Sequence, residues 1–146
     1  MNFEDGTLEQ YAVNDQLIEV VFYKIFVHCV LIGIPLAFVA FLFILSLNIS
    51  IQISSIALLC LIISNLIFIN FFSLGNALSL KKGSILGLLI TIPFLIPVLI
   101  VLGKMTTSAL LGLSLVGHLS LLVGVMILVA SFIPFVISFI LRTHLE

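Results

Sequence analysis

The sequence between two lysines decides the fold of this chain. Residues 25–80 read IFVHCVLIGIPLAFVAFLFILSLNISIQISSIALLCLIISNLIFINFFSLGNALSL and contain no Asp, Glu, Lys or Arg. About 20 apolar residues are enough for a helix to cross a bilayer, so this stretch has room for two crossings. Residues 32–45 within it do not alternate apolar with polar side chains, as a membrane β-strand would. The stretch therefore predicts two transmembrane helices joined by a short, uncharged turn.

Two more charge-free stretches follow, at residues 83–103 and 105–141, and each has room for one more crossing. A helix in hydrocarbon satisfies its own backbone hydrogen bonds, so all four crossings are expected to be helical. We predict an all-α fold, a polytopic membrane bundle of about four transmembrane helices with a short cytoplasmic helix at the amino terminus. This divides the chain into a cytoplasmic segment, 1–18, and a transmembrane domain, 19–146, whose spans lie at about 20–46, 54–79, 85–103 and 119–141.

The composition excludes several classes of protein. Of 146 residues, 63% are hydrophobic and 8% are charged, whereas about a quarter of the residues of a soluble protein are charged. The formal net charge is −1, so the chain has no basic excess with which to bind nucleic acid. A soluble enzyme domain, a disordered linker and a nucleic-acid binder are therefore excluded. The acidic first residues also differ from a signal peptide, which begins with basic ones.

The few basic residues predict the orientation in the membrane. With four spans, Lys24, Lys81, Lys82 and Arg142 fall on one side of the membrane, and Lys104 falls on the other. Short loops rich in Lys and Arg remain cytoplasmic. Both termini are therefore expected in the cytoplasm.

Polar residues within the second span follow a helical repeat. Ser54, Asn65 and Asn76 are spaced eleven residues apart, and eleven steps of 100° return to nearly the same face of a helix. Ser79 lies close to that face. A polar face in lipid should turn toward other helices or a wet cavity. It is either a set of interhelical hydrogen bonds or part of a substrate path.

The third span contains Pro93 and Pro97, which remove backbone hydrogen bonds and should bend the helix. This bend is either a hinge for alternating access or a fixed shape. Two pairs of small residues permit close helix approach: Gly83 with Gly87, and Ser120 with Gly124.

The amino-terminal segment differs from the rest of the chain. Thr7 followed by Gln10 is a capping-box pattern, and Asp5 and Glu9 suit the positive end of a helix. Anionic cytoplasmic lipids would repel an acidic helix at the membrane surface. The segment is either a contact for a protein partner or a solvated lead-in to the first span.

The sequence predicts no catalytic residues. Gly112 and Gly117 have the spacing of a phosphate-binding loop, but His118 follows where Lys is needed. The chain also lacks a nucleophile elbow and a metalloprotease motif. We therefore expect no enzyme activity, no directly bound cofactor and no metal site, and any ATP hydrolysis must belong to a partner.

Histidines and cysteines complete the candidate residues. His28 and His118 are candidate axial ligands for haem, as is His144 with less support, because imidazole binds haem iron. The alternative for each is a histidine side chain that forms a hydrogen bond with a neighbouring helix. Cys29 and Cys60 lack a C-x-x-C spacing and are expected to be small apolar core residues.

A combination of short strings extends over nearly the whole chain. DGTLEQ stands at 5–10, LKKG at 80–83, IPFLIP at 92–97 and SFIPF at 131–135, while Lys24 and His28 enter the first span and Arg142 closes the last. In this combination the chain resembles the cytochrome c maturation B (CcmB) family. Its members are membrane permease subunits of haem-exporter-type ABC transporters.

The resemblance implies a function and a set of partners. It implies a separate ATPase subunit that uses ATP, other haem-handling membrane proteins, haem as a possible cargo, and a homo- or hetero-oligomer in the lipid bilayer. The location implied is the bacterial inner membrane, or that of mitochondria in some lineages. The residues implied to contact the ATPase are Asp5, Gly6, Thr7, Leu8, Glu9 and Gln10, together with Lys81 and Lys82 in the turn after the second span.

The resemblance also has a departure. Family members normally carry two more spans ahead of the DGTLEQ string, so this chain is expected to match the last four spans of six. Two alternatives to a permease follow: a non-transporting membrane scaffold that recruits the ATPase, or an inactive fragment of a split permease.

Overall fold

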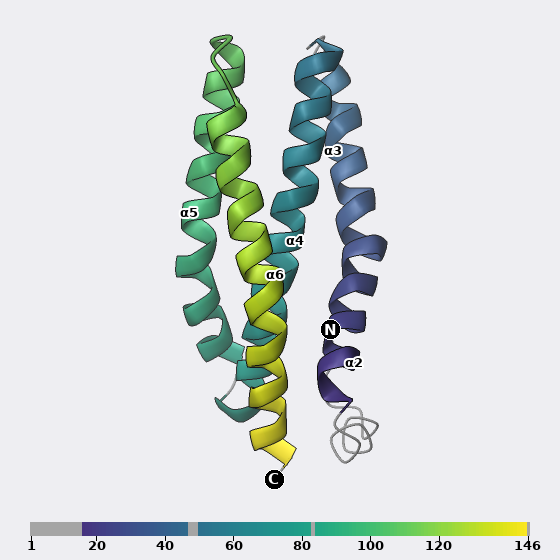
Figure 1. Cartoon of the computed structure of the whole chain (residues 1–146), viewed down its shortest axis with the longest axis vertical. Coiled ribbons are helices and arrows are strands. Elements are labelled where there is room, and N and C mark those ends of the chain that lie inside the picture. The colour runs from purple at the N-terminus through teal and green to yellow at the C-terminus, as the bar shows by residue number, and fades with distance from the viewer. Residues whose placement is uncertain (1–15, 47–49, 83, 146) are drawn as a thin grey trace.

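Four long helices run side by side along most of the molecule (Figure 1). The computed structural model describes residues 16–46, 50–82 and 84–145. The first helix consists of α2 (Leu17–His28), a π-helical turn η1 (Cys29–Gly33) and α3 (Ile34–Ser46); the others are α4 (Ile51–Lys82), α5 (Ser84–Leu110) and α6 (Val116–Leu145). All four are long and apolar enough to cross a membrane, which confirms the predicted all-α membrane bundle.

The helices extend beyond the spans predicted for them. The clearest case is α5, which continues through Lys104 to Leu110, because lysine is a good helix former and does not end a helix by itself. Gly112 ends it, with φ 67°, a backbone conformation that favours glycine. The N–H of Leu113 then donates to the carbonyl of Ser108 at 2.9 Å, which closes the helix end.

A proline explains the π-helical turn in the first helix. Pro35 has no N–H to donate, and its ring crowds the carbonyl of Leu31, four residues earlier. Just before it the helix widens, and the N–H of Ile34 donates to the carbonyl of Cys29, five residues back. A widened turn of this kind is one of the few ways in which a helix accommodates such a disruption without ending.

The central helix of the bundle is α4. It packs against α5 and α6 on one side and against the first helix on the other (Figure 1). The contact between α5 and α6 is much smaller than that of either helix with α4. By contrast, α3 is peripheral, because Ala37 is its only buried residue. The core lies between α4 and its neighbours, and its buried members include Val21, Cys60, Ile67, Met105, Leu122 and Ile137.

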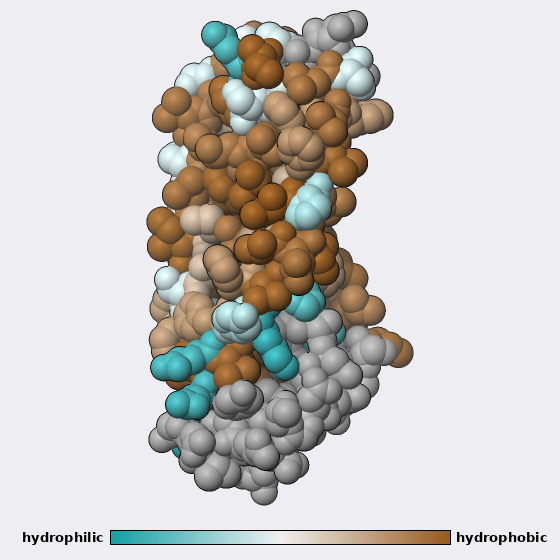
Figure 2. Space-filling view, turned by 90° about the vertical axis from the view of Figure 1, so that its right-hand side faces the viewer, coloured by the Kyte–Doolittle hydropathy of each residue, from teal (hydrophilic) through white to brown (hydrophobic). Residues whose placement is uncertain are grey.

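The two ends of the bundle differ. The start of α2, the turn from α4 to α5 and the end of α6 lie at one end, and the turn from α5 to α6 lies at the other (Figure 1). On the face beside α2 and α3, a broad hydrophobic belt gives way to hydrophilic residues toward the first of these ends (Figure 2). An apolar exterior with polar ends is what a helix bundle needs in a bilayer.

Candidate functional site

A side-chain amide joins α4 to the π-helical turn. The Nδ2 of Asn65 donates to the carbonyl of Gly33 at 3.0 Å. Gly33 is buried, and a Cβ at this position would lie 3.3 Å from the Cδ1 of Ile69 on α4. A small residue therefore lets the two helices approach until one amide can bridge them. In hydrocarbon an amide that bonds to the backbone of another helix helps to hold the two helices together.

The other members of the predicted polar face have different surroundings. Ser54 is fully buried and donates to the carbonyl of Ser50 in its own helix at 3.0 Å. Asn76 is exposed, and the hydroxyl of Ser79 donates to the backbone carbonyl of Asn76 at 2.7 Å. At Asn65 the geometry is therefore that of an interhelical hydrogen bond.

Three buried polar residues on α4 lie outside the predicted face. Ser64, Asn70 and Ser73 are at most 3% exposed. Asn70 donates to the carbonyl of Leu66 at 2.9 Å and Ser73 to that of Ile69 at 2.7 Å. Within the described part of the chain, the hydroxyl of Ser64 and the side-chain oxygen Oδ1 of Asn70 have no hydrogen-bond partner. The interior of α4 is therefore more polar than its eleven-residue repeat suggests, although nothing brings these groups together into a reaction centre.

The closest helix contact is between α4 and α5. Gly75 and Gly87 face each other, and a Cβ on Gly87 would overlap the carbonyl of Gly75. The hydroxyl of Thr91 lies at this crossing, 2.7 Å from the carbonyl of Gly87 and 3.4 Å from that of Phe71. Next to it the rings of Phe71 and Phe94 stack, with centroids 5.2 Å apart. Of the two predicted small-residue pairs, the one that contains Gly87 makes a close helix approach, to Gly75 on α4. The other does not at Gly124, where a Cβ would meet open space.

Both prolines of α5 lie on exposed positions, and the helix continues through them from Ser84 to Leu110. Each removes a donor, so the carbonyls of Leu89 and Pro93 lack the usual partner four residues later. The role of Pro93 and Pro97 as a hinge stays a prediction.

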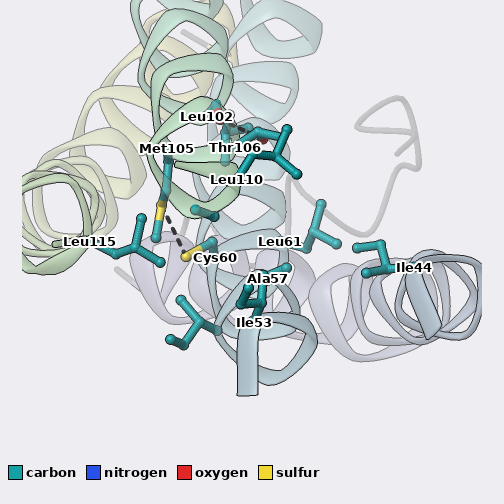
Figure 3. Close-up of a pocket in the computed structure, with 12 residues that line it drawn as sticks. Ile44, Ile53, Ala57, Cys60, Leu61, Leu102, Met105, Thr106, Leu110 and Leu115 are labelled. Carbon is teal, nitrogen blue, oxygen red and sulfur yellow. Dashed lines mark hydrogen bonds between the residues drawn. The ribbon is translucent and has the colours of Figure 1, made fainter. Parts of the chain in front are cut away.

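An apolar cavity of about 220 Å³ lies near the end of the bundle formed by the α5–α6 turn (Figure 3). The Cys60 thiol donates to the sulfur of Met105 at 3.4 Å beside this cavity. Thr106 also lines it, but its hydroxyl donates to the carbonyl of Leu102 in its own helix. Cys29 and Cys60 are both buried and free, as expected of small core residues.

The candidate haem ligands lie on different helices. His28 ends α2 and His118 lies in the first turn of α6, and both are half-buried. The Nδ1 of His118 is buried and has no partner in the described part of the chain. The side chain of His144 is outside the described part. Among the residues that the structure describes, no three His, Cys, Asp or Glu side chains are grouped to hold a metal ion.

The residues proposed to contact an ATPase are only partly described. Asp5 to Gln10 lie outside the described residues, and of Lys81 and Lys82 only the backbone is described, in the last turn of α4. That turn lies at the same end of the bundle as the start of α2 (Figure 1). Lys104 is exposed on α5, toward the opposite end.

Comparison with known proteins identifies a family. The model of the family described as CcmB protein matches residues 1–144. A protein named Heme exporter protein B from Pseudomonas aeruginosa is 31% identical over 140 residues, which are 94% of this chain and 63% of that protein. Its namesake from Haemophilus influenzae is 30% identical in an alignment 148 residues long, which covers 99% of this chain and 67% of that protein. The chain thus spans about two thirds of the length of these relatives. No solved structure matches it.

Proposed function

This chain belongs to the CcmB protein family, and on that basis we propose that it is a membrane permease subunit of a haem-exporter-type ABC transporter complex in cytochrome c biogenesis. The observation that carries the proposal is the family match along residues 1–144 of a chain with four membrane-spanning helices. Both relatives bear the name Heme exporter protein B. Haem is the proposed cargo, and ATP is used by a separate subunit.

The proposed contact with the ATPase is the acidic segment from Asp5 to Gln10, together with the turn that carries Lys81 and Lys82. The segment precedes α2 in the sequence, and Leu17, Val21 and Ile25 of α2 are buried. The ring of Phe22 also meets that of Phe135 on α6 edge to face, with centroids 6.3 Å apart. A displacement of the amino-terminal segment would therefore pass through α2 into α6 and α4.

We propose that both termini are cytoplasmic and that the membrane is the bacterial inner membrane. Four basic residues at one end and Lys104 toward the other support this orientation. It can be tested by cysteine labelling, because Cys29 and Cys60 are buried in spans and are poorly placed to react. In intact cells, a Thr107→Cys variant should react with an impermeant thiol reagent and a Ser84→Cys variant should not. The reverse pattern contradicts the orientation.

Deletion of the coding region at its own locus tests the function itself. The expected result is loss of covalently bound haem from c-type cytochromes, measured by haem staining of denatured membrane proteins. The b-type cytochromes, measured by absorbance in the same membranes, should stay, because their haem is not covalently attached. Restoration of the intact locus should return c-type haem. Unchanged c-type cytochromes in the deletion strain would rule out the proposed role.

A further inference from the structure

An apolar groove of about 430 Å³ runs between α4, α5 and α6, separate from the cavity beside Cys60. It exists because α5 and α6 both pack on α4 but contact each other little. Its floor is made of residues that are at most 4% exposed, namely Val98, Leu122 and Val129. Its rims are strongly exposed and include Leu121, Leu128 and Phe132. The groove is therefore open to the surroundings of the bundle along its length.

The lining of the groove restricts what can occupy it. Every lining residue is apolar, and none is a His, Cys, Met or Tyr that could ligate haem iron. Water is also a poor occupant, because a buried water needs two to four polar partners. A hydrocarbon chain, in contrast, would contact the floor and rims with no unpaired polar group.

The depth of the groove matches one leaflet of a bilayer. From Leu121 to Phe132 the α6 rim advances by eleven positions along the helix, which is about 16 Å at 1.5 Å per residue. Half of a hydrocarbon core is about 15 Å thick. The stacked rings of Phe71 and Phe94 lie at the deep end, toward the middle of the bundle. A single acyl chain from the leaflet near the α5–α6 turn would fill this depth.

A positive charge stands at the shallow end of the groove. Lys104 follows the lining residues Pro97 and Val101 by seven and three positions, so it shares their face of α5. It is exposed and has no hydrogen bond or ion pair within the described residues. Helical side chains lean toward the amino end of their helix, which for Lys104 is the direction of the groove. An ammonium group in this place suits an anionic lipid headgroup.

We propose that the groove between α4, α5 and α6 binds an anionic phospholipid, with an acyl chain along α6 from Leu121 to Phe132 and the headgroup phosphate at Lys104. This site does not depend on the proposed transport function. It assigns a role to the one basic residue that lies apart from the other four.

The chain contains no tryptophan, so a single introduced tryptophan can report on contact with lipid. Leu128 lines the groove and is 61% exposed, and its neighbour Ile127 is 57% exposed but does not line the groove. The two positions are about 1.5 Å apart in depth, which makes Ile127→Trp a matched control for Leu128→Trp. Each full-length variant is placed in phosphatidylcholine vesicles that contain a minor fraction of phosphatidylglycerol with brominated acyl chains.

Bromine quenches tryptophan on contact, so quenching measures how often each lipid occupies a position. We expect phosphatidylglycerol to be favoured over phosphatidylcholine about fivefold at Leu128→Trp, the factor expected of one lysine near an anionic lipid. At Ile127→Trp the two lipids should be nearly equivalent. Adding Lys104→Gln should abolish the preference at Leu128→Trp and leave Ile127→Trp unchanged.

Three outcomes would overturn the proposal. Equal preference at the two tryptophans would mean that the groove does not retain an anionic lipid. If the preference for phosphatidylglycerol persists in Lys104→Gln, the headgroup does not bind at Lys104. Weaker total quenching at Leu128→Trp than at Ile127→Trp would mean that another protein segment covers the groove.

Discussion

The two sides of α4 are held by different means. Toward α5, the backbones meet directly where Gly75 faces Gly87, with no side chain between them. Toward the first helix, contact depends on the amide of Asn65, which bonds to the carbonyl of Gly33 at 3.0 Å. The first contact is steric and has no room for an added atom, whereas the second is one hydrogen bond beside a widened turn. The α4–α5 pair should therefore be the rigid part of the bundle, and the first helix should be the part that is more easily displaced.

The largest effect should come from Gly87→Ala. Its Cβ would overlap the carbonyl of Gly75, so α4 and α5 must separate, at a cost of about 1–3 kcal/mol. The measurement is the thermal unfolding midpoint of the protein in detergent. Gly103→Ala is the control, because a Cβ there has nothing within 4 Å, and its midpoint should not fall. Equal midpoints for the two variants would contradict a close contact between Gly75 and Gly87.

A smaller loss of stability is expected for Asn65→Leu. It removes the bond to Gly33, and interhelical hydrogen bonds in membranes contribute about 0.6 kcal/mol on average and at most about 1.7. Asn76→Leu is the matched control because Asn76 is exposed on the same helix, and its unfolding midpoint should change less. If Asn65→Leu lowers the midpoint more than Gly87→Ala does, the order of the two contacts is wrong.

The smallest effect should follow Thr91→Val, which keeps the shape of the side chain and removes its hydroxyl. That hydroxyl is buried at the glycine crossing, 2.7 Å from the carbonyl of Gly87. The expected cost is about 0.6 kcal/mol or less, measured by the same unfolding midpoint. Thr106→Val is the control, since Thr106 is exposed and bonds its own helix at 2.9 Å. A fall in the midpoint as large as that of Gly87→Ala would show that the hydroxyl, rather than backbone packing, stabilises the contact between α4 and α5.

Charge and hydropathy predicted the number and type of helices because both are properties of continuous stretches. The partner of each residue on another helix lies far away in the sequence, and these pairings were not predicted. The spacing of Gly83 and Gly87 predicted a close helix approach, which Gly87 makes, but it could not identify Gly75 on α4 as the partner. The π-helical turn before Pro35 was also missed, because it is a local response to proline within a uniformly apolar run.

The polar face illustrates the same limit. An eleven-residue repeat places Ser54, Asn65 and Asn76 on one side of α4, but depth along the helix decides their surroundings. Asn76 lies toward the end and is exposed, whereas Asn70 is buried although it lies off that face. Since α4 has neighbours on two sides, its polar residues cannot be sorted into an inner and an outer face from periodicity alone.

We propose that this chain works as a permease subunit with a separate ATPase. The most direct measurement is the ATP hydrolysis that copurifies with the tagged chain from native membranes solubilised in mild detergent, because the chain has no phosphate-binding loop of its own. We predict copurifying activity that falls strongly in the double variant Asp5→Ala and Glu9→Ala, and that persists in Lys104→Gln. Absence of ATPase activity from the wild-type preparation, or activity that the double variant leaves unchanged, would contradict the account.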